Sequence, residues 1–227
     1  EFERNHFALL ALMSIYGIEL LEDNAVECRS NLNSLFCGHL RIQGDDVLAQ
    51  AADKVLSLNI VQGARMVGAV RIIAVDTVAS KEAHARELGA THFVNASLAD
   101  PVAAIKELTG GAGAEFTFEA IGLPTPIEQA FDSTKKGGTC VVAGICKADA
   151  RARINVNQLL YAEKTLKGTL YGSMRPRVDL PRIVHLHQCG ALSLDRLLTR
   201  TWRLDQINEA YLSLERGEVA RSLIVWD

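Results

Sequence analysis

The sequence predicts an α/β fold in which helices wind over both faces of a parallel sheet, preceded by a truncated and atypical N-terminal segment. From about residue 71 onward, short β-branched runs alternate with helical stretches, which is the pattern of βαβ units. The run Arg71 to Asp76 (RIIAVD) is apolar on both faces, as expected for a central strand covered by helices. Residues 1–56 lack this alternation, although Phe7 to Leu21 could form a helix.

The first unit continues with a helix from Ser80 to Leu88, with Ser80 as its N-cap and Gly89 just past its end. The next strand is predicted over His92 to Asn95. Asp100 then caps a helix that has Pro101 at its first position and ends at Leu108. A glycine-rich break follows this helix, so each change of element coincides with a recognised start or stop signal.

The later elements follow from the same alternation of short strand patterns and helical patterns. Strands are predicted over Glu115 to Ala120, Thr139 to Ala143, Leu166 to Tyr171 and Leu223 to Trp226, and helices over Thr125 to Thr134, Leu180 to Cys189 and Asp205 to Glu215. We expect three parts: an atypical segment over 1–56, an α/β domain over 57–171, and a C-terminal segment over 172–227.

Composition narrows the class of protein. The chain has 227 residues, of which 48% are hydrophobic and 22% charged, with a formal net charge of −3. This balance is typical of a globular protein and argues against a broad basic face for nucleic acid. Five cysteines do not form the dense pattern of a disulfide scaffold. The apolar stretch Phe7 to Ile18 is too short to span a bilayer. We therefore expect a cytoplasmic protein with neither a nucleic-acid nor a membrane partner.

Asp76 closes the clearest strand, at the edge where such sheets bind ligands. An acidic side chain there accepts hydrogen bonds from the hydroxyls of an adenosine ribose and repels a 2′-phosphate, which favours NAD over NADP. Alternatively, Asp76 is a solvated residue that caps the following turn. Position alone leaves both interpretations open.

The glycine-rich loop that accompanies such an aspartate is missing from the sequence. No GxGxxG occurs in the chain, and the stretch about twenty residues before Asp76 reads ADKVLS from Ala52 to Ser57. Side chains there would hold a pyrophosphate off the backbone, and Asp53 would add a like charge. We expect dinucleotide affinity to be poor unless this segment follows an unusual path.

Six blocks in order resemble the cofactor-binding part of the zinc-containing alcohol dehydrogenases, in the medium-chain dehydrogenase/reductase superfamily. They are VQGARMVGAVRIIAVD (61–76), ELGATHFVNAS (87–97), FTFEAIG (116–122), GGTCVVAGI (137–145), KTLKGTLYGS (164–173) and INEAYLSLERGEVARSLIV (207–225). The likeness begins near residue 57 and continues to the end. It implies that 57–171 is a Rossmann-like dinucleotide-binding domain and that 172–227 packs back toward the catalytic-domain side. It also implies NAD as cofactor, an alcohol or aldehyde as substrate, and a homodimer paired through the strand at about 166–171.

The resemblance also implies roles for individual residues. Asp76 would bind the adenosine ribose with help from Lys81, and Arg221 would pair with the pyrophosphate through its planar fork. The other expected cofactor contacts lie at the ends of strands: Ala120 and Ile121 lining the cleft, Ala143 and Ile145 flanking the nicotinamide and its ribose, and Thr169 and Tyr171 offering backbone groups to the carboxamide. Taken singly, the apolar members would be core residues, and Lys81 and Arg221 surface charges.

The family also implies a catalytic zinc, but its ligands are not identifiable in this chain and we assign no metal residues. CGHL, at Cys37 to Leu40, echoes a ligand segment, yet Leu40 stands where the family has glutamate, and Cys37 and His39 supply two donors only. His185, His187 and Cys189 do not share one side of a helix. No catalytic residue is assigned.

Three interpretations follow. The chain is an NAD-linked alcohol dehydrogenase whose activity is impaired, or a non-catalytic truncated homologue that keeps the fold and the dimer edge. The third is a zinc-independent reductase of the same superfamily, which the KTLKGTLYGS and GEVARS blocks favour least.

Overall fold

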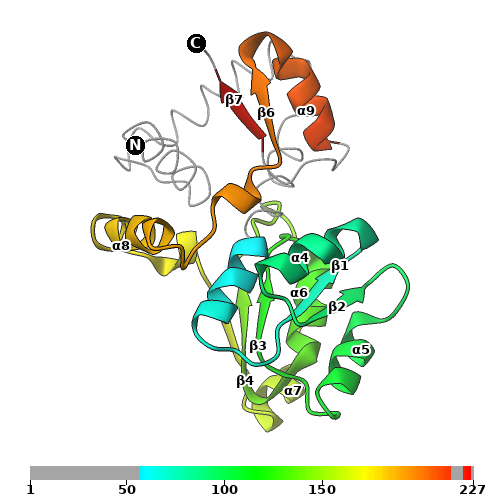
Figure 1. The fold of residues 1–227 in the computed structure, drawn as a ribbon. Coiled ribbons are helices and arrows are strands. Elements are labelled where there is room, and N and C mark those ends of the chain that lie inside the picture. The colour runs from blue at the N-terminus through cyan, green and yellow to red at the C-terminus, as the bar shows by residue number, and fades with distance from the viewer. Residues whose placement is uncertain (1–56, 216–221, 226–227) are drawn as a thin grey trace. The chain divides into compact units, whose positions relative to one another are not determined.

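The computed structural model describes residues 57–215 and 222–225 (Figure 1). Contacts divide the chain into two compact units, one formed by Leu56–Ser173 and the other containing the described residues from Met174 on. The first unit is a Rossmann-like α/β unit of parallel strands and helices. In the part of the chain that the structure describes, no helix is both long and apolar enough to cross a membrane.

The first unit begins with a helix over 57–66 and the pair of parallel strands β1 (Ile73–Asp76) and β2 (His92–Asn95). Between these strands the chain passes through a 3-10 turn (Ala79–Lys81) into α4 (Glu82–Leu88). The expected N-cap at Ser80 is wrong, because Ser80 lies inside that turn and Lys81 precedes α4 without a side-chain cap. Gly89 ends α4 at a φ of 125°, a value that L side chains rarely adopt.

Helix α5 (Pro101–Leu108) follows the sequence signals closely. The Asp100 carboxylate accepts the backbone N–H groups of Val102 and Ala103, and Pro101 occupies the first helical position. An oxygen acceptor there satisfies backbone donors that have no partner inside the helix. The expected bounds of α5 and of β2 are confirmed.

The second sheet of this unit has the order β3-β4-β5 and is entirely parallel. It comprises β3 (Ala114–Glu119), β4 (Thr134–Val142) and β5 (Thr165–Gly168), with α6 (Pro124–Ser133) between β3 and β4 and α7 (Val156–Tyr161) between β4 and β5. Helix α6 contacts β3, β4 and the neighbouring α5. It buries Ile127 and Phe131 against the sheet, and Phe131 is only 1% exposed. This packing supplies the apolar core beneath the sheet.

The strands of the first unit differ in which side chains they bury. Within the described residues, β1 pairs with β2 alone, and Val75 is 39% exposed. The central strand covered on both faces that the sequence predicts is therefore not seen for β1 in these residues. In β3 the polar Thr117 and Glu119 are buried, while Phe116 is 61% exposed on the other face. Thr117 tolerates burial because its hydroxyl bonds that of Thr134, 2.7 Å away.

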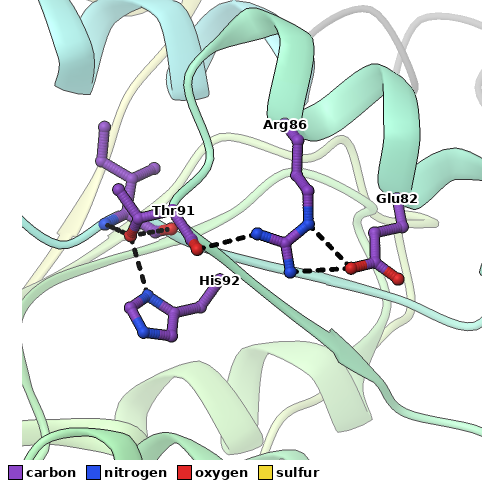
Figure 2. A network of polar contacts seen from close by, with 5 residues as sticks. Glu82, Arg86, Thr91 and His92 are labelled. Atoms are coloured by element: carbon purple, nitrogen blue, oxygen red, sulfur yellow. Dashed lines mark hydrogen bonds and ion pairs between the residues drawn. The ribbon is translucent and has the colours of Figure 1, made fainter.

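A polar network links the amino ends of β1 and β2 (Figure 2). The Thr91 hydroxyl donates to the carbonyl of Ile72 at 3.0 Å and accepts its N–H at 2.8 Å. Arg86 on α4 donates to the Thr91 carbonyl at 2.9 Å and pairs with Glu82. These contacts tie α4 to the edge of the strand pair opposite Asp76.

The second unit is described by itself. It contains α8 (Pro176–Gln188), a 3-10 turn (Asp195–Leu197), strand β6 (Arg200–Arg203), a second 3-10 turn (Leu204–Gln206), α9 (Ile207–Glu215) and β7 (Ser222–Val225). Strands β6 and β7 are parallel, and the indole N–H of Trp202 donates to the Ser222 hydroxyl at 3.0 Å. Near the start of α8, the Arg175 N–H donates to Asp179 and lowers the pKa of that carboxyl.

Candidate functional site

The candidate site lies at the carboxyl ends of the strands in the first unit. Register places Glu119 opposite Val142, and Val142 opposite Gly168, so β3, β4 and β5 end at one level. The residues that follow them therefore emerge along the same edge of the sheet. This is the edge where doubly wound sheets bind ligands.

Asp76 ends β1, and its carboxylate meets Lys81 from the following 3-10 turn. The Lys81 ammonium donates to Oδ1 at 2.8 Å and to Oδ2 at 2.6 Å, and both side chains are about one-third exposed or less, at 32% for Lys81 and 26% for Asp76. Oδ1 also accepts the backbone N–H of Val78 at 2.9 Å. The sequence left ribose binding and turn capping open. The structure shows the capping contact, while ribose binding stays a prediction.

The turn after β3 and the loop after β4 touch through their backbones. A Cβ added to Gly122 would lie 2.2 Å from the carbonyl oxygen of Ile145, and one added to Gly144 would lie 2.1 Å from the Gly122 nitrogen. Gly122 also has a φ of +80°. Only glycines permit this approach, which brings two predicted cofactor contacts, Ile121 and Ile145, onto adjoining loops.

The predicted lining residues differ in exposure. Ala120 is 6% exposed and belongs to the core, whereas Ile121 is 45% exposed and Ile145 is 63% exposed. Ala143 is half-buried, and its N–H donates to the Glu119 carbonyl at 2.8 Å. Ile121 and Ile145 are therefore available to a ligand, while the cofactor contacts of all four residues stay predictions.

The two residues predicted to meet the nicotinamide carboxamide, Thr169 and Tyr171, follow β5. The Thr169 N–H donates to the Val142 carbonyl at 3.0 Å, and its hydroxyl lies 2.9 Å from that of Ser173. The strand predicted to Tyr171 ends earlier, at Gly168, and Tyr171 lies in a 3-10 turn with a φ of +50°. Arg221 lies outside the described residues, as do Cys37, His39 and Asp53.

Glu119 was not singled out in the sequence, yet it is the buried acidic group of this edge. It is 3% exposed, and its Oε1 accepts the N–H groups of Ile121 and Gly122, both at 2.7 Å. Its Oε2 is buried and has no hydrogen-bond partner in the part of the chain that the structure describes. The only sequence signal for it is an acidic residue that ends an apolar run just before a turn glycine.

No three His, Cys, Asp or Glu side chains converge on a metal-sized site within residues 57–215 and 222–225. On α8, His187 Nδ1 lies 3.2 Å from the Leu192 carbonyl, and the Cys189 thiol, just past the helix, donates to the Leu186 carbonyl at 3.4 Å. Cys140 is buried in β4, and burial raises the pKa of its thiol. The donors among the described residues therefore do not fit a zinc ion.

Comparison with known proteins decides the family. Residues 56–187 match the family model described as zinc-binding dehydrogenase. The chain belongs to the zinc-binding dehydrogenase family. Its alcohol dehydrogenase relatives include the NDMA-dependent alcohol dehydrogenase of Amycolatopsis methanolica, 39% identical over 75% of this chain and 46% of the relative. Another is the geraniol dehydrogenase of Castellaniella defragrans, 38% identical over 75% of this chain and 46% of the relative.

Solved structures agree with this assignment. Benzyl alcohol dehydrogenase from Acinetobacter calcoaceticus matches with a TM-score of 0.72 and 36% identity, over 75% of this chain and 46% of that one. An alcohol dehydrogenase zinc-binding domain protein from Burkholderia ambifaria matches with a TM-score of 0.71 and 37% identity, over 79% of this chain and 47% of that one. The chain spans about half the length of these relatives. The family and the Rossmann-like fold expected from the sequence are confirmed.

Proposed function

We propose that this chain is the cofactor-binding part of an NAD-linked, zinc-type alcohol dehydrogenase that transfers a hydride between an alcohol or aldehyde and NAD. The observation that carries the cofactor proposal is the Asp76 carboxylate, half-buried at the end of β1 with Lys81 beside it. A carboxylate in that position binds ribose hydroxyls and discriminates against a 2′-phosphate. When bound, NAD supplies the hydride acceptor, and this chain's part is to hold and orient it.

The proposed contacts follow the order of the strands. Asp76 and Lys81 hold the adenosine ribose, the exposed Ile121 and Ile145 cover the apolar surface of the cofactor, and Thr169 and Tyr171 meet the carboxamide through backbone groups. We assign Ala120 and Ala143 to the wall behind these residues, and Arg221 to the pyrophosphate. No residue of the described chain is assigned a catalytic role.

The edge strand β5 supports a homodimer. Within the described residues it pairs with β4 alone, and all four of its residues are exposed. Exposed apolar side chains occur in β5, at Leu166, and close to it in the sequence, at Tyr161 and Leu170. An unpaired edge of this kind is completed when a second copy adds its own strand. A cytoplasmic setting is proposed from the cysteine usage, because the five cysteines of the sequence do not form the dense pattern of a disulfide scaffold.

A non-catalytic homologue is the second candidate, because the sequence has no GxGxxG and carries Ala52 to Ser57 at the place of that loop. Under this alternative the fold and the dimer edge remain while cofactor affinity is lost. Zinc-independent reduction by the same scaffold ranks behind both, because the relatives named above are alcohol dehydrogenases.

Fluorescence titration with NADH tests the proposal, with NADPH as the competing cofactor because one structural neighbour, 26% identical, is described as bound to NADP. The control variant replaces Ala52 to Ser57 with the loop GLGGVG. Binding of NADH by the parent at about micromolar Kd, and more tightly than NADPH, supports the dehydrogenase. Binding by the loop variant alone supports the non-catalytic homologue, and binding by neither contradicts the dinucleotide proposal.

A further inference from the structure

Glu119 is a charged residue in a place where charge is costly. It ends β3, is 3% exposed, and has one carboxylate oxygen, Oε2, that is buried without a hydrogen-bond partner among residues 57–215 and 222–225. Burying a polar atom without a partner is unfavourable, and an apolar side chain would avoid the cost. The contacts made by the other oxygen must therefore offset it.

Oε1 holds the turn that follows the strand. It accepts the backbone N–H groups of Ile121 and Gly122, each at 2.7 Å. A short bond from an N–H to a carboxylate is stronger than one to a neutral acceptor. One atom therefore fixes two consecutive peptide groups, in the turn that carries the exposed side chain of Ile121.

The main chain of Glu119 holds the neighbouring loop as well. Its carbonyl accepts the N–H groups of Ala143 at 2.8 Å and Gly144 at 3.1 Å, just past β4. The Gly122 and Gly144 backbones then lie so close that neither admits a Cβ. A shift of the turn after β3 therefore also displaces the loop that carries Ile145.

We propose that Glu119 is a positioning residue for the dinucleotide: its buried carboxylate holds the turn 120–122 against the loop 143–145, and so sets the wall that the cofactor contacts. The inference rests on the function proposed above. It assigns the effect to Oε1 as a hydrogen-bond acceptor, so a glutamine retains the effect, whereas a side chain of similar length without an acceptor loses it.

Three variants separate positioning from general stability. Glu119→Met removes both acceptors and keeps the length of the side chain, and Glu119→Gln keeps one acceptor oxygen. Thr117→Val is the matched control, because Thr117 is buried on the same face of β3 and its hydroxyl bonds Thr134 rather than the turn. Each variant is measured for its Tm and its Kd for NADH, and the exchange rates of the Ile121 and Gly122 amide protons are measured without cofactor.

We expect Glu119→Met to raise the Kd about tenfold or more and to accelerate exchange at both amides by at least about tenfold, because two donors lose their acceptor. Glu119→Gln should stay within about threefold of the parent in Kd and exchange. Thr117→Val should lower the Tm with the Kd unchanged. Equal Kd values for Glu119→Met and the parent would overturn the inference and leave the proposed function intact.

Other outcomes are equally decisive. If Glu119→Gln loses as much affinity as Glu119→Met, the negative charge matters rather than the acceptor, and the inference is wrong. If Thr117→Val weakens binding as much as Glu119→Met at a similar Tm, the effect is general destabilisation. If the parent does not bind NADH, the proposed function fails together with the cofactor role of Glu119, and unchanged amide exchange in Glu119→Met would then also refute the hold on the turn.

Discussion

Replacing Gly122 with alanine should damage the site far more than the same change at Gly137. Both glycines have a positive φ, +80° at Gly122 and +69° at Gly137, so each replacement carries a backbone penalty of about 1–2 kcal/mol. At Gly137 nothing lies within 4 Å of the new Cβ, whereas at Gly122 the Cβ would lie 2.2 Å from the Ile145 carbonyl oxygen.

The additional cost follows from that contact. An ordinary contact needs at least 3.4 Å, so the two loops must separate by about 1 Å. Separation pulls the Gly122 N–H from the Glu119 carboxylate, and an unpaired buried donor costs about 1–3 kcal/mol. We therefore expect Gly122→Ala to lose about 2–5 kcal/mol of unfolding free energy and Gly137→Ala about 1–2 kcal/mol.

Thermal unfolding followed by circular dichroism measures the difference. In a chain of this size 1 kcal/mol corresponds to about 2–4 °C in Tm, so the additional cost should make Gly122→Ala melt roughly 2–12 °C below Gly137→Ala. NADH affinity should fall in Gly122→Ala and be retained in Gly137→Ala. Equal Tm values for the two variants, or full NADH affinity in Gly122→Ala, would refute the close packing of the two loops.

Three further predictions concern Asp76 at the end of β1, the buried Cys140 in β4, and Arg86 on α4. Asp76→Ser should weaken NADH about tenfold and strengthen NADPH, because Lys81 is released to meet a 2′-phosphate; parallel titrations check this, and equal losses for both cofactors would contradict it. Burial raises the pKa of Cys140 above its ordinary value of 9.0, so its stabilising contribution is present below that pH and is lost as pH rises through the higher folded value. The parent should therefore lose more stability than Cys140→Ala between about pH 8 and 10 in denaturant titrations, and in the native state alkylation should reach the exposed Cys189 and spare Cys140. Arg86→Met removes an exposed ion pair and should change the free energy of unfolding by less than about 1 kcal/mol, with NADH affinity unchanged; a larger loss of stability would show that the network in Figure 2 matters more than its exposure suggests.

Local signals account for what the sequence predicted well. The cap at Asp100 with Pro101 after it, and the short run HFVN ending at Asn95, each depend on residues within one turn or strand. Asp76 and Lys81 are only five positions apart, so their meeting also depends on a short segment. Elements and contacts of this kind are visible in a single sequence.

Elements that depend on pairing with distant residues were missed, or were predicted too short. Strand β4 begins at Thr134 rather than Thr139, because pairing with β3 extends it through the residues KKGG, whose own β propensity is low. Strand β6 (Arg200–Arg203) is polar and was not predicted; it forms by pairing with β7, and the Arg200 guanidinium lies 4.0 Å from the centre of the Trp202 ring. Short α7 was also missed, although Asn155 caps it.

The candidate site also has a part that could be predicted from the sequence and a part that could not. The strand ends and their order could be predicted, since the carboxyl ends of parallel strands share an edge. The role of Glu119 could not be predicted from the sequence. It depends on the turn 120–122 folding back onto the Glu119 side chain, and on the loop after β4 approaching that turn. Sequence spacing records neither contact.

Amide hydrogen exchange with and without NADH tests the central claim most directly, because it locates the cofactor on the sheet. Bound NADH should slow exchange in the segments that end β1, β3 and β4, at 76–81, 119–122 and 143–145. Exchange should be unchanged at 91–92 and 110–113, at the amino ends of β2 and β3. Protection confined to the amino ends, or no protection at saturating NADH, would contradict a dinucleotide site at the carboxyl edge.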